Sequence, residues 1–221
     1  GEIWTDGDGG GPNGNQVEAP ILDGLGSLWI GAFENEADAL CWERGLGYGD
    51  AFCQRAISPT IAWDGSNDVE LTFRYFNDTE ENFDYTRVLL RRLPAGLETR
   101  LNPQNGLTDQ IGTARDHPAS THTGVTYQTQ ITAAQLEGST GFQLVFEMTS
   151  DGSWSDEDIF YDTSYGPFAA DEIGFSGGSA AFFDFETDLQ GWTADGCPGN
   201  GIDWLVADIA AYGVIDPCGC K

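Results

Sequence analysis

The chain has 221 residues, of which 36 are Asp or Glu and nine are Lys or Arg, so its formal net charge at pH 7 is −27. Such an acidic surface repels nucleic acid and anionic membranes, whose protein partners carry basic patches. Hydrophobic residues make up 40% of the chain and aromatic residues 12%, which suffices for a core and excludes a disordered acidic tail. No apolar run approaches the roughly 20 residues that cross a membrane, so we expect no membrane insertion.

Short apolar segments with two-residue alternation recur along the chain, and turn residues separate them. Alternation of this kind indicates strands with one face toward a core. After a Gly- and Asp-rich irregular arm, we expect a helical turn over 133–136 and strands over 27–33, 52–61, 69–76, 85–93, 125–131, 141–148, 168–175 and 181–186. A helix is the alternative for 85–93, and 97–121 is predicted to be a surface loop. The pattern predicts an all-β fold, an antiparallel β-sandwich.

The stretch DGSWSDEDIFYD, residues 151–162, crowds five carboxylates around Trp154 between two predicted strands. These charges repel one another unless water, salt or a cation compensates them, and calcium in proteins takes oxygen ligands. The sequence therefore predicts a structural Ca²⁺ site with the ligands Asp151, Asp156, Asp158 and Asp171. The alternative is a solvated loop whose charge is balanced by the arginines of the 85–93 strand, Arg87, Arg91 and Arg92.

Three aromatic residues of the same region, Trp154, Tyr161 and Tyr165, stand next to carboxylates. Aromatic rings beside hydrogen-bond acceptors form the kind of platform on which a sugar ring stacks, so the three residues are a predicted ligand site. The alternative is that the rings pack beneath the loop as part of the core.

The five cysteines point to an oxidising compartment outside the cytosol. Cys41 and Cys53 bracket the Gly-rich stretch WERGLGYGDAF and are predicted to form a disulfide, with two separately buried thiols as the alternative. Cys197, Cys218 and Cys220 allow one further bridge and leave an odd thiol.

The motif PheAspPheGlu at 183–186, followed by Gly191 and Trp192, resembles the opening strand of MAM-like and carbohydrate-module-like jelly rolls. Such jelly rolls are accessory domains of secreted bacterial proteins, including immune-inhibitor-A-type metalloproteases. The segments SLWIGAF…GYGDAFCQRAISPTI and DGSWSDEDIFYDTSYGPFAADEI look like the same group. The resemblance implies a jelly-roll, concanavalin-like sandwich, and it implies a cation between Glu186 and Asp171.

The opening motif stands after the closing motif in this chain, which bears on the domain organisation. We divide the chain into an arm over 1–26, a sandwich module over 27–176, and a strand with a Cys- and Gly-rich segment over 177–221. That last segment starts a second module, folds back to complete this sandwich, or completes a neighbour's sandwich by strand addition.

The expected function is that of a non-catalytic, calcium-stabilised module with a structural or adhesive role in a secreted cell-surface protein or fibre. Its expected partners are other copies or neighbouring modules, with glycans as a further possibility. A carbohydrate-binding module of a secreted hydrolase is the second hypothesis. A glycoside hydrolase is the third, and it is disfavoured because no hydrolase motif is present and 36 acids bring carboxylates together by chance.

Overall fold

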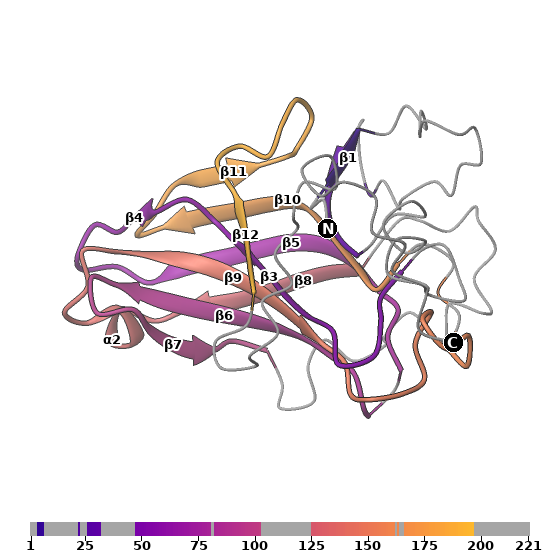
Figure 1. The fold of residues 1–221 in the computed structure, drawn as a ribbon. Coiled ribbons are helices and arrows are strands. Elements are labelled where there is room, and N and C mark those ends of the chain that lie inside the picture. Colours follow the sequence, from indigo (N-terminus) through magenta and orange to yellow (C-terminus); the bar gives the residue numbers. More distant parts are fainter. Residues whose placement is uncertain are drawn as a thin grey trace, which may run out of the picture.

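The computed structural model describes residues 4–6, 22, 26–31, 47–80, 82–102, 125–161, 163 and 166–196. These residues form two antiparallel sheets of six strands each, which pack against each other (Figure 1). The predicted all-β sandwich is therefore confirmed. Cys41, Tyr165, Cys197, Cys218 and Cys220 lie outside the described residues.

The first sheet is built around β10, which pairs with β5 along most of its length. The strand order is β1-β2-β10-β5-β8, and β11 adds to β10. The bounds are β1 (Trp4–Asp6), β2 (Gly26–Ile30), β5 (Val69–Asn77), β8 (Val125–Ile131), β10 (Phe168–Gly177) and β11 (Ala181–Phe183). The strand β1 lies inside the predicted irregular arm, which corrects that prediction at residues 4–6 because they pair with β2.

The second sheet is built around β9, which pairs with β6 over nine positions. The order is β12-β3-β9-β6-β7, and β4 also pairs with β9. The bounds are β3 (Cys53–Ile57), β4 (Ile61–Ala62), β6 (Tyr85–Leu93), β7 (Leu97–Arg100), β9 (Gly141–Thr149) and β12 (Thr193–Gly196). Residues 85–93 form a strand and not a helix. The strand β7 corrects the loop prediction at residues 97–100, and residues 103–121 lie outside the described residues.

The core lies between the sheets and is formed by the faces that the alternation predicted. In β9 the side chains of Phe142, Leu144, Phe146 and Met148 are all fully buried, and in β5 so are Val69, Leu71 and Phe73. The ring centroids of Phe73 and Phe146 are 5.2 Å apart in an edge-on contact across the two sheets. Such edge-to-face pairs add to the burial of apolar area.

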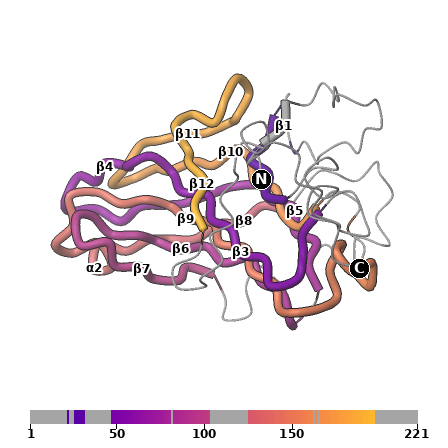
Figure 2. Tube along the Cα trace, in the orientation of Figure 1, coloured from indigo at the N-terminus to yellow at the C-terminus, as the bar shows by residue number. Residues whose placement is uncertain are grey.

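Residues 177–196 fold back onto the same sandwich. The strand β11 pairs with β10 in the first sheet, whereas β12 pairs with β3 in the second (Figures 1 and 2). Between them Phe185 and Trp192 are buried, and the Trp192 ring stacks on Phe146 with centroids 5.6 Å apart. The motif that resembles a jelly-roll opening strand thus contributes to the core of this module.

The helix α2 (Ala133–Leu136) is the single helical turn that the sequence predicts. Thr132 caps its start, because the hydroxyl accepts from the Gln135 N–H and the Gln135 side chain accepts from the Thr132 N–H. Within the described residues no helix has the length and apolar character of a membrane span.

Candidate functional site at the acidic end of the sandwich

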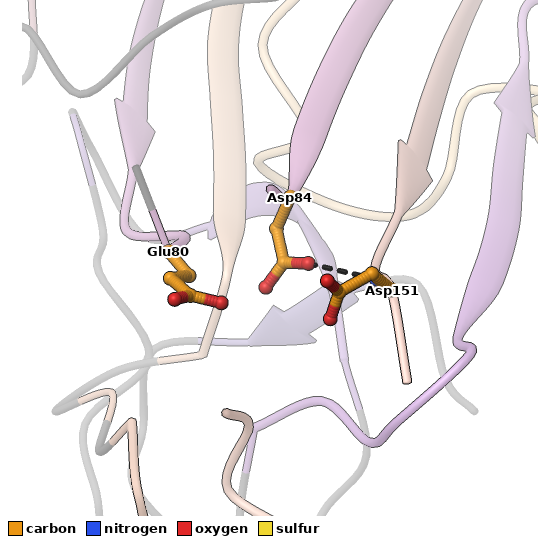
Figure 3. Close-up of side chains that lie close together, drawn as sticks. All are labelled: Glu80, Asp84 and Asp151. Atoms are coloured by element: carbon orange, nitrogen blue, oxygen red, sulfur yellow. Dashed lines mark hydrogen bonds between the residues drawn. The ribbon is translucent and has the colours of Figure 1, made fainter. Parts of the chain in front are cut away.

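Three carboxylates meet at one end of the sandwich: Glu80, Asp84 and Asp151 (Figure 3). Glu80 and Asp84 lie in the connection from β5 to β6, and Asp151 follows β9 by two residues. The antiparallel register of β6 and β9 pairs Tyr85 with Thr149, so the start of one strand and the end of the other meet here. One oxygen of each carboxylate lies within 4.8 Å of the others, close enough for one cation to contact all three.

Asp84 is the buried centre of this cluster, and both of its oxygens accept hydrogen bonds. The Tyr48 hydroxyl donates to Oδ2 at 2.6 Å, and the Asp151 N–H donates to Oδ1 at 2.9 Å. The Glu80 N–H donates to the Tyr48 hydroxyl at 3.2 Å, and the Asp84 N–H donates to the Glu80 carbonyl at 3.1 Å. The carboxylate of Asp84 is therefore fixed in place by donors from two other segments of the chain.

Burial, together with the charges of neighbouring carboxylates, makes the carboxyls of Glu80 and Asp84 hold protons more tightly than usual. Burial raises the pKa of Glu80 to about 7, with further contributions from the charges of Asp84, Asp151 and Asp158. Burial also raises the pKa of Asp84 to about 6, although its hydrogen bonds from Tyr48 and Asp151 oppose the shift. Burial, then the charge of Asp84, raises the pKa of Tyr48, so its hydroxyl stays protonated at neutral pH. Near pH 7 Glu80 and Asp84 are therefore partly protonated, and a cation that binds between them would displace these protons.

Asp156 is a structural anchor and lies apart from the cluster. It is fully buried, and its oxygens accept from the Tyr48 N–H at 3.1 Å, the Thr163 N–H at 2.9 Å and the Thr163 hydroxyl at 2.8 Å. It also touches Gly47, whose φ is +117° and whose missing Cβ would lie 1.9 Å from the Asp156 carboxylate. Only glycine fits beside this carboxylate.

Asp158, Asp171 and Glu186 come from three further segments, and the predicted cation between Asp171 and Glu186 stays a prediction. Asp158 accepts from three backbone N–H groups of its own loop, and Asp171 is buried in β10, where it accepts from the Ser27 hydroxyl at 3.0 Å. Glu186 follows β11 and is half-buried. Among the residues that the structure describes, Asp151 is the single predicted ligand that belongs to a group of three ligand-type side chains within 4.8 Å.

Sequence reasoning missed Glu80 and Asp84, although the acidic run NDTEENFD at 77–84 is a visible signal. The missing information is the pairing of β6 with β9, which brings this run to Asp151. Asp156, Asp158 and Asp171 each accept hydrogen bonds from donors of their own neighbourhood, and for the buried Asp156 and Asp171 such donors offset the cost of burial.

The predicted aromatic platform is divided in the same way. Trp154 is 51% exposed, and its ring lies 6.1 Å from that of Phe160, which is 61% exposed and was not predicted. Tyr161 is buried in the core, where its ring contacts Tyr48 and its hydroxyl donates to Asp78 at 2.9 Å. Tyr161 is therefore not part of a surface platform, because its ring and hydroxyl are both used inside the protein.

Two of the three arginines proposed to neutralise the acidic loop bind acids of the second sheet instead. Arg87 pairs with Glu147 at 3.0 Å and Arg91 with Glu98 at 2.8 Å. Arg92 takes part in none of the ion pairs found among the described residues.

Comparison with protein-family models and with curated proteins finds no match to this chain.

Proposed function

We propose that this chain is a non-catalytic extracellular β-sandwich module with a structural or adhesive role, and that calcium at Glu80, Asp84 and Asp151 stabilises its acidic end. The observation that carries the calcium site is the convergence of three carboxylates from two loops within 4.8 Å. Calcium takes six to eight oxygen ligands, and carboxylates from flexible loops suit its variable geometry. Burial, and after it repulsion by Asp84 and Asp151, raises the pKa of Glu80, and a cation here offsets that repulsion.

A structural role fits the way in which Asp84 is held. A catalytic acid or base must reach the substrate, whereas Asp84 is buried and both of its oxygens already accept from protein donors. A cation that contacts this group ties the 78–84 connection to the end of β9. Such a cation makes the 78–84 connection more rigid.

An extracellular location is supported by Cys53, which begins β3, is buried and is disulfide-bonded. Disulfides persist in oxidising compartments and on cell surfaces. The partner that we propose is Cys41, which lies outside the described residues.

The calcium proposal is tested by thermal unfolding with added calcium and with a chelator. A ligand that binds only the native state at a hundred times its Kd adds about 2.7 kcal/mol, which is roughly 5–10 °C for a chain of this size. The informative variant is Asp151→Asn, which removes the charge and keeps an acceptor for the Ser153 N–H. We expect it to lose the calcium shift and to be no less stable than the wild type in chelator.

The matched control is Glu137→Gln, which removes one exposed charge beside α2, at the opposite end of the sandwich (Figure 1). It should keep the full calcium shift. An equal Tm in calcium and in chelator at low salt would refute the calcium site.

Glycan binding is the second candidate function, and one observation favours it. Trp154 and Phe160 expose neighbouring rings, tilted by 37°, on a single loop. A glycan array with the wild type and Trp154→Ala tests it, and specific sugar binding that the variant loses would support this candidate.

A further inference from the structure

The tip of the acidic loop, defined here as residues 153–160, exposes three large apolar side chains. Trp154, Ile159 and Phe160 are 51%, 48% and 61% exposed. The other large apolar residues that are exposed in the described structure come singly from separate segments, at Phe83, Leu97 and Phe182. Single exposed apolar residues are ordinary on protein surfaces, but grouped ones mark sites of interaction.

Asp158 holds the tip in this outward arrangement. Its Oδ2 accepts from the Trp154 N–H at 2.9 Å, and its Oδ1 accepts from the N–H groups of Ser155 and Phe160, both at 3.1 Å. Trp154 and Ile159 have φ values of +66° and +60°, a conformation that is unfavourable for large and β-branched residues. The loop thus keeps apolar side chains in solvent at a conformational cost.

The tip is also tied to the body of the sandwich. The Ser155 hydroxyl donates to Asp50 Oδ1 at 2.8 Å, and the Asp50 N–H donates to Glu157 at 2.9 Å. Ser155 itself is fully buried, so the tip rests on an ordered base. Binding at such a surface requires little ordering of the loop, which lowers the entropic cost of association.

Carboxylates surround this apolar tip. Glu157 and Asp158 belong to the tip itself, and the Asp50 carboxylate accepts the hydrogen bond from the Ser155 hydroxyl. The tip is therefore an aromatic surface with a negative border, and a complementary partner brings positive charge.

We propose that the tip docks a segment of a partner protein that places an arginine or lysine over the rings of Trp154 and Phe160 and a second cation against the carboxylate border. Cations bind aromatic faces, arginine stacks on them, and Trp and Arg dominate the energetics of protein interfaces. A neutral sugar would use the rings and leave the negative border uncompensated, so the charges favour a cationic protein segment. This inference rests on the proposed adhesive role and is independent of calcium.

The test is fluorescence anisotropy with a labelled glycine-rich peptide that carries one leucine between two arginines, titrated with the full chain. Trp154→Ala and Phe160→Ala should each weaken binding about tenfold, the loss expected for a desolvated cation–π contact. The matched control is Phe182→Ala, which removes another aromatic side chain that is 58% exposed, but from β11. Thermal unfolding verifies that all three variants fold.

Unchanged binding in Phe182→Ala together with the loss in the two tip variants supports the docking surface. If all the variants bind the peptide equally, the peptide is attracted to the acidic chain in general, and the proposed docking surface is overturned. A sugar that binds at the tip while the peptide does not also overturns it. If calcium fails to change the Tm but the tip variants still lose the peptide, the calcium role fails and the docking surface stands.

Discussion

The Tyr48 hydroxyl donates a 2.6 Å hydrogen bond to Asp84 and accepts one of 3.2 Å from the Glu80 N–H. One side chain thus connects two of the three carboxylate residues of the cluster. Tyr48→Phe removes both bonds while it keeps the ring in the core. We expect a loss of about 1–3 kcal/mol in the free energy of unfolding, because a buried carboxylate loses a donor.

Urea denaturation in chelator measures this loss. The control is Tyr127→Phe, whose hydroxyl donates to the uncharged Leu101 carbonyl at 3.1 Å. A loss as small as that of the control would show that Tyr48 does not support the cluster.

The pH dependence of stability follows from the raised pKa values of Glu80 and Asp84, about 7 and about 6 against ordinary values of 4.5 and 3.8. Between the ordinary and the raised pKa the folded chain binds more protons than the unfolded chain. The free energy of unfolding in chelator therefore falls as the pH rises from about 5 to about 7.

Urea denaturation across this pH range gives the slope, and Glu80→Gln should make it shallower because glutamine does not titrate. A slope that is unchanged in this variant would assign the pH dependence to other carboxylates. With calcium present we expect the wild-type slope to weaken, because the cation binds the deprotonated form.

Substitutions at Gly47 and Gly65 allow the cost of steric overlap to be measured apart from the cost of a positive φ. Both have positive φ, but a Cβ at Gly47 would meet the Asp156 carboxylate at 1.9 Å, whereas a Cβ at Gly65 meets nothing within 4 Å. Gly65→Ala should cost about 1 kcal/mol, and Gly47→Ala should cost on the order of 3 kcal/mol or more. Equal losses of stability for the two variants in urea denaturation would show that the Asp156 side chain can shift to admit a Cβ at little cost.

Trp192 tests whether the last described strands belong to the fold of this module. Its stacking on Phe146 predicts that Trp192→Ala costs about 3–5 kcal/mol, while Phe182→Ala, which removes an exposed ring from β11, stays within about 0.5 kcal/mol. The wild-type Tm should not depend on protein concentration, because these strands complete their own sandwich. A Tm that rises with concentration would indicate that the strands are exchanged between copies.

The proposed Cys41–Cys53 disulfide is checked by mass spectrometry of the unreduced, proteolysed protein. A peptide that joins the two cysteines is the expected product, and reduction should lower the Tm because the cross-link restricts the unfolded chain. A peptide that joins Cys53 to Cys197, Cys218 or Cys220 would contradict the pairing.

The strands and their buried faces could be predicted from the sequence because alternation is a local property. Leu144, Phe146 and Met148 alternate in the sequence and are all buried. The arginines of β6 also follow this rule, since Arg87 and Arg91 point away from the core and pair with acids of neighbouring strands. The competing helix at 85–93 lost because its residues pair with β9 over their whole length.

The site could be predicted only in part because it depends on contacts between distant residues. Asp156 and Asp158 look equivalent in the sequence, yet one is a buried anchor and the other holds an exposed tip. Asp84 differs from them because the end of β9 and Tyr48 reach it from elsewhere in the chain. In a chain with 36 acids, composition marks a region as acidic, but tertiary structure selects the carboxylates that meet.

The placement of β11 and β12 in opposite sheets has a consequence for biosynthesis. While residues 181–196 are still inside the ribosome, β10 and β3 each lack a neighbour and Phe146 lacks the ring that covers it. The nascent module therefore has an unpaired strand edge in each sheet until β11 and β12 emerge and pair with these edges.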